Sequence, residues 1–275
     1  MISTRGLAPL AALALIERQG DKFSDAVRNE PIARREIAAF RARIGEIGSV
    51  DDLVKDHAVF SFAMKAFGLE NQIYAKAMMK KILTADPLDK KSLVNRLTDP
   101  RYKEINKVLG FDPDGTVGRP DFGSAAWTNA LVERFVSQKM IDGQMEENPA
   151  VGIALDFERK AKGLTSWFKV LADPKMATFI RTAFGLPDSI AQGSIDGQAR
   201  LLEQRMKIGE LQDPQVRKKL VRQFAAIAGV TDQATAQPAV VGLMSRPRDQ
   251  SNWSPIVIDV SAFNANGMSA YRVWR

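Results

Sequence analysis

The chain contains one helix-ending segment twice, and this repetition constrains its fold more than any other feature. Residues 56–69 read DHAVFSFAMKAFGL and residues 173–186 read DPKMATFIRTAFGL, so the two segments align without a gap. Phe67 and Phe184 are 117 residues apart (184 − 67 = 117). The same separation relates further identical residues, namely Ser49 and Ser166, Phe40 and Phe157, and Glu30 and Glu147. A constant separation over such a length predicts two tandem copies of one multi-helix unit.

Glycine and aspartate mark the ends of the predicted helices. Glycine adopts the left-handed conformation that commonly ends a helix without the steric cost of a Cβ atom, which predicts C-terminal caps at Gly68 and Gly185. An Asp-Pro pair suits a helix start, because the carboxylate accepts free backbone N–H groups and proline fits the first helical position. We therefore predict N-terminal caps at Asp99, Asp173 and Asp213.

Most of the chain outside these caps shows helical periodicity, with apolar residues three or four positions apart. In the first copy we expect helices over residues 32–47 and 70–83, and a helical start interrupted near Pro9 and resumed from Asp21. In the second copy the expected helices cover residues 126–141, 149–162, 174–184, 195–208 and 214–227. The predicted fold class is therefore all-α.

Composition divides the chain into four parts. Residues 111–123 are rich in glycine, proline and aspartate and lack apolar periodicity, which predicts a linker. The first helical repeat unit is then residues 1–110, and the second is residues 124–229. Residues 230–275 form a tail of different character, poor in helix-forming pattern at its start.

The tail carries a β-hairpin signal. A β-branched run at residues 255–263 and a second run at residues 268–274 flank an Asn-Gly turn. An isolated hairpin is marginally stable in water, so this one needs a surface to pack on. That surface belongs either to its own helices or to a partner, including a second copy of the chain. The residues expected to contact a partner are Ile256, Ile258, Val260, Tyr271, Val273 and Trp274.

The residue inventory excludes several kinds of chemistry. The chain has no cysteine and a single histidine, His57, which excludes disulfides, thiolate catalysis and Cys- or His-rich metal sites. Phosphate-binding glycine loops and common hydrolase motifs are absent. Asp112 and Asp114 resemble the start of a calcium loop, but the glutamate that ends such a loop is missing. We predict a non-enzymatic protein with no catalytic residues, cofactor or metal, while a carboxylate pair assembled in space stays an alternative.

Charge and hydropathy narrow the range of partners. A formal net charge of +7 favours acidic partners such as nucleic acid, an anionic membrane or an acidic protein face. The basic residues are dispersed and the aromatic residues stand at core spacing, unlike a surface that stacks single-stranded nucleic acid. We therefore expect protein binding, with a basic helical nucleic-acid-binding protein as the alternative. No apolar run reaches the ~20 residues of a membrane span, which predicts a cytoplasmic protein or one exported without a cleaved signal peptide.

Several motifs together resemble a known family. They are SVDD at residues 49–52, FAMKAFGLE at residues 62–70, and NRLTDPRY at residues 95–102. The chain resembles bacterial domain-of-unknown-function family 1217 in these motifs, over roughly residues 23–229 and including the repetition. Members of that family are often encoded among flagellar genes, so the resemblance implies a part in flagellar assembly or motility. Its motifs describe helix ends and cores, and they imply no catalytic residue.

Overall fold

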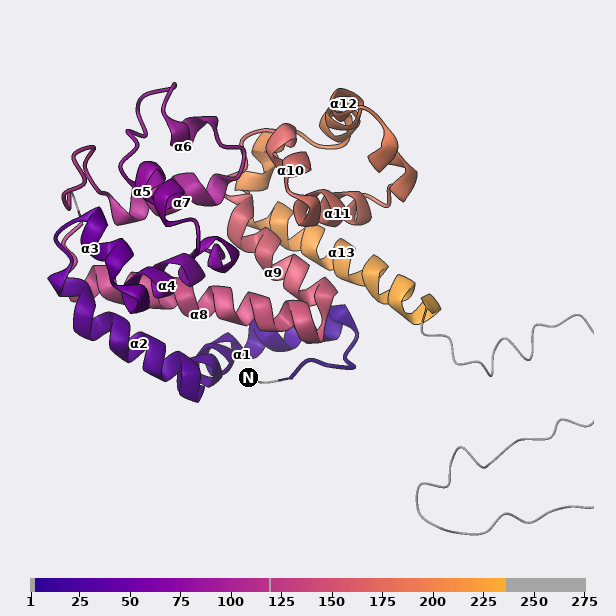
Figure 1. Cartoon of the computed structure of the whole chain (residues 1–275). Coiled ribbons are helices and arrows are strands. Elements are labelled where there is room, and N and C mark those ends of the chain that lie inside the picture. Colours follow the sequence, from indigo (N-terminus) through magenta and orange to yellow (C-terminus); the bar gives the residue numbers. More distant parts are fainter. Residues whose placement is uncertain (1–2, 119, 236–275) are drawn as a thin grey trace, which may run out of the picture. The chain divides into compact units, whose positions relative to one another are not determined.

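The computed structural model describes residues 3–118 and 120–235, and helices dominate both ranges (Figure 1). The first half contains α1 (Pro9–Asn29), α2 (Pro31–Arg43), α3 (Val50–Lys55), α4 (His57–Ala66), α5 (Lys76–Leu83), α6 (Leu93–Arg96) and α7 (Pro100–Leu109). The second half contains α8 (Ala125–Glu147), α9 (Pro149–Ala161), α10 (Trp167–Ala172), α11 (Pro174–Ala183), α12 (Ile195–Arg205) and α13 (Pro214–Thr235). Within the described residues, β-structure amounts to two isolated bridges. The predicted all-α class is confirmed.

Several predicted helix boundaries differ from the structure. Helix α8 was expected to end at residue 141 and ends at Glu147. Helix α13 was expected to end at residue 227 and continues to Thr235, into the segment predicted as a tail.

The helix expected over residues 70–83 begins only at Lys76, after a 3-10 turn at Glu70–Gln72 in which no residue is buried. Without an apolar contact to the core, this turn gains too little from packing to continue as an α-helix. The two predicted N-terminal helical stretches correspond to α1, which kinks at Gln19 (φ −129°, ψ 26°), two residues before the predicted restart at Asp21, while Pro9 begins the helix and does not interrupt it.

Each half has a core centred on three stacked aromatic rings. In the first, Phe62 of α4 lies 4.2 Å from Phe40 of α2 and 4.4 Å from Phe135 of α8, measured between ring centroids. In the second, Phe179 of α11 lies 3.9 Å from the ring of Phe157 on α9 and 4.6 Å from that of Phe224 on α13. The middle rings are buried on both faces, so each stack joins three helices.

Helix α8 belongs to the second half in sequence but contributes to the first core in space. Its residues Leu131 and Phe135 are buried among side chains of α2 and α4. The segment predicted to be a linker also contributes, because Phe111 and Phe122 are buried in the same core. Helix α1 in turn contacts both α8 and α9. Helices of the two halves are therefore packed against each other along α8.

The two copies of the repeated segment have the same local geometry. Gly68 and Gly185 lie at φ 65° and φ 62°, the left-handed conformation. The Leu69 N–H donates to the Met64 carbonyl over 2.8 Å, and the Leu186 N–H donates to the Arg181 carbonyl over 2.9 Å. Each helix therefore ends in a Schellman-type cap, with the orphan carbonyl groups of its last turn satisfied.

Two further expectations concern the tail and the membrane. The predicted hairpin and its six candidate partner-binding residues lie outside the described residues. Among residues 3–118 and 120–235, no helix combines the length and the apolar character that crossing a bilayer requires.

Candidate functional site: a charged cavity bordered by α4, α7, α8, α9 and α11

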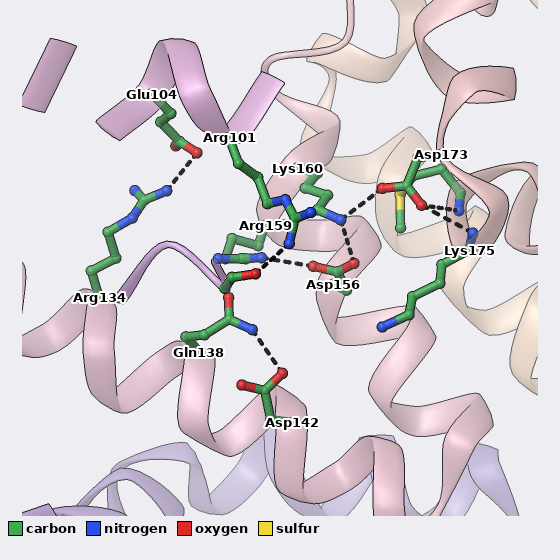
Figure 2. A network of polar contacts seen from close by, with 12 residues as sticks. Arg101, Glu104, Arg134, Gln138, Asp142, Asp156, Arg159, Lys160, Asp173 and Lys175 are labelled. Atoms are coloured by element: carbon green, nitrogen blue, oxygen red, sulfur yellow. Dashed lines mark hydrogen bonds and ion pairs between the residues drawn. The ribbon is translucent and has the colours of Figure 1, made fainter. Parts of the chain in front are cut away.

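A polar cavity of about 290 Å³ lies where α4, α7, α8, α9 and α11 approach one another (Figure 2). Its basic lining residues are Lys65, Arg101, Arg159, Lys160 and Lys175. Its acidic lining residues are Glu70, Asp142 and Asp156. Five positive and three negative groups give the lining an excess of positive charge, which favours an anionic occupant.

Asp156 of α9 is the most deeply buried charged group of this cavity, with 3% of its surface exposed. Arg159 Nη2 donates to its Oδ1 over 2.8 Å, and Lys160 Nζ donates to its Oδ2 over 2.7 Å. Lys160 Nζ also donates to Asp173 Oδ2 over 2.7 Å. Because both oxygens of Asp156 are paired, its negative charge is compensated within the protein.

Asp173 and Arg101 hold the starts of α11 and α7 at the cavity. Asp173 Oδ1 accepts from the backbone N–H of Lys175 over 3.0 Å and so caps α11. Asp99 caps α7 and also accepts from the Arg101 guanidinium over 2.7 Å. The same guanidinium donates to the carbonyl oxygen of Gly68. These bonds fix the end of α4 next to the start of α7.

Three polar groups at the cavity remain without a partner in the described chain. The buried Arg159 Nε and Gln138 Oε1 make no hydrogen bond, although Gln138 Nε2 donates to Asp142 Oδ1 over 2.8 Å. Lys175 is exposed, and its Nζ makes no hydrogen bond or ion pair with the described residues. Its side chain points from α11 toward Asp156 and Asp142 (Figure 2). Unused hydrogen-bonding capacity on a charged lining is typical of a binding site.

The surroundings shift the pKa of two carboxyl groups in opposite directions. Partial burial raises the pKa of Asp142, against the Gln138 hydrogen bond and the positive charges of Lys175 and Arg159. Asp142 keeps contact with solvent, which limits the energetic effect of this shift. Burial also acts to raise the pKa of Asp173, but the hydrogen bond and charge of Lys160 and two backbone N–H groups hold it below the ordinary value.

We expect Asp173→Asn to lower the free energy of unfolding by about 1 kcal/mol at neutral pH, because asparagine keeps the cap and loses the ion pair. A carboxyl group whose pKa is lowered by folding stabilises the folded state at pH values above about 3.9, the ordinary pKa of an aspartate. This stabilisation disappears as the pH falls through the folded-state pKa. The difference between variant and parent should therefore shrink in acid. Urea unfolding across a pH series measures it.

Asp142→Asn is the matched comparison and should behave in the opposite way. A pKa raised on folding makes the ionised carboxylate unfavourable, so asparagine should slightly raise stability at neutral pH and lose this advantage in acid. If both variants show the same sign of pH dependence, the assignment of the two carboxyl environments is wrong.

A second polar cavity, of about 320 Å³, adjoins the first and shares Lys65, Glu70 and Asp142 with it. Its charged lining residues are Glu30, Glu36, Lys65, Glu70, Lys139, Asp142 and Glu146. Five acidic against two basic groups make this second cavity negative. The two cavities therefore form a groove with a basic end and an acidic end.

The structure brings together some of the residues singled out from the sequence. Gly68 and Asp99 lie beside the cavity, and Asp173 borders it at the start of α11. Gly185 and Asp213 do not line it, although Asp213 Oδ1 accepts from the Gln215 N–H over 2.8 Å at the start of α13.

Sequence reasoning missed Asp156, Arg159 and Lys175, and alignment of the two halves at a separation of 117 residues contains the signal that could have found them. The residues 117 positions earlier are Ala39, Ala42 and Ala58. By contrast, the Lys160–Asp173 ion pair has a counterpart at that separation, the 2.7 Å pair of Arg43 and Asp56. At these three aligned positions the second half has a charged residue where the first half has alanine. In the described chain, no group of three or more His, Cys, Asp or Glu residues is placed to hold a metal ion.

Comparison with known proteins gives one family and one solved structure. A family model described as protein of unknown function (DUF1217) matches residues 66–216. A crystal structure of a protein from Agrobacterium tumefaciens, a structural genomics target, is similar to this chain with 31% sequence identity and a TM-score of 0.72. The similarity covers 86% of this chain and 98% of that one. No curated protein matches the chain.

Proposed function

Because the chain belongs to the DUF1217 family of proteins of unknown function, we propose that it is a non-enzymatic, protein-binding component of bacterial flagellar assembly or motility. The flagellar part of this proposal comes from the gene neighbourhood that the family resemblance implies. The protein-binding part rests on the charged cavity. The proposed location is the cytoplasm, or the flagellum after export without a cleaved signal peptide.

The proposal rests on one observation. At three aligned positions the first half has alanine and the second half has a charged residue. The first half forms a corresponding helix arrangement with Ala39, Ala42 and Ala58 at these positions. Ion pairs that are buried contribute little net stability, because desolvation offsets most of their attraction. The charges in the second half are therefore better explained by recognition of a ligand than by the needs of folding.

The state of Asp156 and Asp173 supports binding over catalysis by these two residues. A general acid or base must have an oxygen within reach of the substrate. Both oxygens of Asp156 accept from cationic side chains, and both oxygens of Asp173 accept from Lys160 or backbone N–H groups. These carboxylates hold the lining in place.

We also propose that the two halves are tandem copies of one unit. The helix pairs α3–α4 and α10–α11 begin and end at residues 117 apart, with serine and aspartate N-caps in both. The stacked ring pairs Phe40–Phe62 and Phe157–Phe179 and the two glycine caps are related by the same separation. The hairpin predicted in the tail, residues 230–275, stays a second proposed contact for a partner or for self-association.

The proposal predicts capture of a protein partner by the full chain from extracts of flagellated cells at physiological salt. Lys175→Glu should abolish this capture, because it places a negative charge at the basic end of the groove. Arg34→Glu is the matched control, since Arg34 is exposed on α2 and does not line the cavity, and it should leave capture unchanged. Affinity capture followed by mass spectrometry measures the outcome.

Nucleic-acid binding is the competing result. Binding through neutralised phosphates weakens steeply as salt rises. If the full chain binds single-stranded or duplex nucleic acid with micromolar affinity near physiological salt, and the affinity falls along that slope, the protein-binding proposal is wrong. Fluorescence anisotropy with labelled oligonucleotides decides between the two functions.

A further inference from the structure

We propose that the groove binds a partner segment of mixed charge, with an acidic side chain in the basic cavity and a basic side chain in the adjoining acidic cavity. This inference rests on the proposed protein-binding function and names the chemistry of the ligand. The carboxylate would be held by Arg159 and Lys175.

The donors for a carboxylate are present and uncommitted. Arg159 is anchored by a single bond from Nη2 to Asp156, which leaves its Nε without an acceptor. Lys175 can donate up to three hydrogen bonds from Nζ and makes none with the described residues. Charge-assisted hydrogen bonds from such groups to a carboxylate are roughly twice as strong as neutral ones.

The acidic residues in the lining favour a carboxylate over a phosphate group. Glu70, Asp142 and Asp156 offset three of the five positive charges around the cavity. The charge count alone favours an anion of either kind, but repulsion from these three negative groups is greater for a doubly charged phosphate than for a singly charged carboxylate. Asp142 and Glu70 face both cavities, so repulsion would grow toward the acidic end.

The acidic cavity determines the charge of the second side chain of the partner segment. Glu36, Glu70 and Glu146 line the adjoining cavity, and Lys65 Nζ is already paired with Glu36 Oε1 over 2.6 Å. A second negative side chain would be repelled there, whereas a lysine or arginine would be attracted. Gln138 Oε1, a buried acceptor without a partner at the basic cavity, can accept a backbone N–H of the segment if the side chains adjust.

The test compares three synthetic peptides of equal length by isothermal titration into the full chain at physiological salt. Their sequences are Glu-Glu-Gly-Lys-Lys, Glu-Glu-Gly-Glu-Glu and Lys-Lys-Gly-Lys-Lys, each blocked at both ends. We expect the mixed peptide to bind at least tenfold more tightly than either of the others. Inorganic phosphate is the fourth probe, and we expect it to bind more weakly than the mixed peptide.

Two double variants locate the binding. Arg159→Ala with Lys175→Ala restores the residues of the first half and should weaken binding of the mixed peptide at least tenfold. Arg34→Ala with Lys55→Ala removes the same charge from exposed positions outside both cavities and should change it less than twofold. If the double variant fails to fold, the single variant Lys175→Gln takes its place, because Lys175 is exposed. It should also weaken binding of the mixed peptide.

Two results overturn the inference. The first is equal weakening by both double variants, which indicates an effect of net charge alone. The second is tighter binding of phosphate or of the all-acidic peptide than of the mixed peptide. Either result leaves the protein-binding proposal standing if the full chain still captures a partner protein. Failure of that capture, with nucleic acid bound instead, is the separate result that removes the proposed function.

Discussion

Replacing Phe62 or Phe179 by alanine is expected to lower the free energy of unfolding by about 3–5 kcal/mol. Each is the middle ring of a three-ring stack, with 1% and 0% of its surface exposed. Removal of the ring leaves a cavity that rigid neighbours on three helices cannot fill, so the cost exceeds the loss of apolar burial. Denaturant unfolding of each single variant measures this.

Phe168→Ala is the control for both variants. Phe168 follows the helix cap of α10 and is 53% exposed, so its replacement should change stability by no more than about 0.5 kcal/mol. A loss below about 1.5 kcal/mol for Phe62→Ala or Phe179→Ala would mean that the corresponding stack does not hold its half together.

The two glycine caps should respond unequally to the same substitution. Gly185→Ala should cost about 1–2 kcal/mol, the strain of a left-handed alanine, because a Cβ atom at Gly185 would meet nothing within 4 Å. Gly68→Ala should cost about 2–4 kcal/mol. Its Cβ atom would lie 3.1 Å from the Gln138 side chain, which is buried and bonded to Asp142, so crowding adds to the backbone strain.

Thermal and urea unfolding of the two variants, with Gly45→Ala as control, test this order. Gly45 has no positive φ and open space around its Cα atom, so alanine there should be neutral or slightly stabilising. Equal losses for Gly68→Ala and Gly185→Ala would show that Gln138 moves aside freely. That result would contradict a lining held in place by its hydrogen bonds.

The sequence predicted the helical class because local signals decide it. Apolar spacing, Asp-Pro starts and glycine ends each act within one or two helical turns, so α11 and α9 were expected close to their observed bounds. Residues 70–75 were predicted as helix in error, because the turn Glu70–Gln72 has helical propensity but no buried residue. The packing of α8 into the first core depends on tertiary contacts that no local pattern contains.

The charged cavity was beyond sequence reasoning for a related reason. Arg101, Gln138 and Lys175 come from three helices far apart in the chain, and only the packing of α7, α8 and α11 brings them to one place. A charged residue on a helix is ordinarily solvated, so α9 gave no sign that Asp156 is buried. The sequence alone could have indicated the site only through alignment of the two halves, which pairs alanines of the first half with charged residues of the second.

The central claim is that the added charges of the second half serve binding, and it predicts that folding does not need them as a set. The direct measurement is the free energy of unfolding of the variant that combines Asp156→Ala, Arg159→Ala and Lys175→Ala. Lys160 keeps its partner Asp173 in this variant, as Arg43 keeps Asp56 in the first half. We expect a loss of less than about 1.5 kcal/mol, since removal of a partly buried ion pair together with both its members is close to neutral. A loss of about 3–5 kcal/mol, the cost typical of a broken buried pair, would show that these charges hold the fold together and would contradict the account.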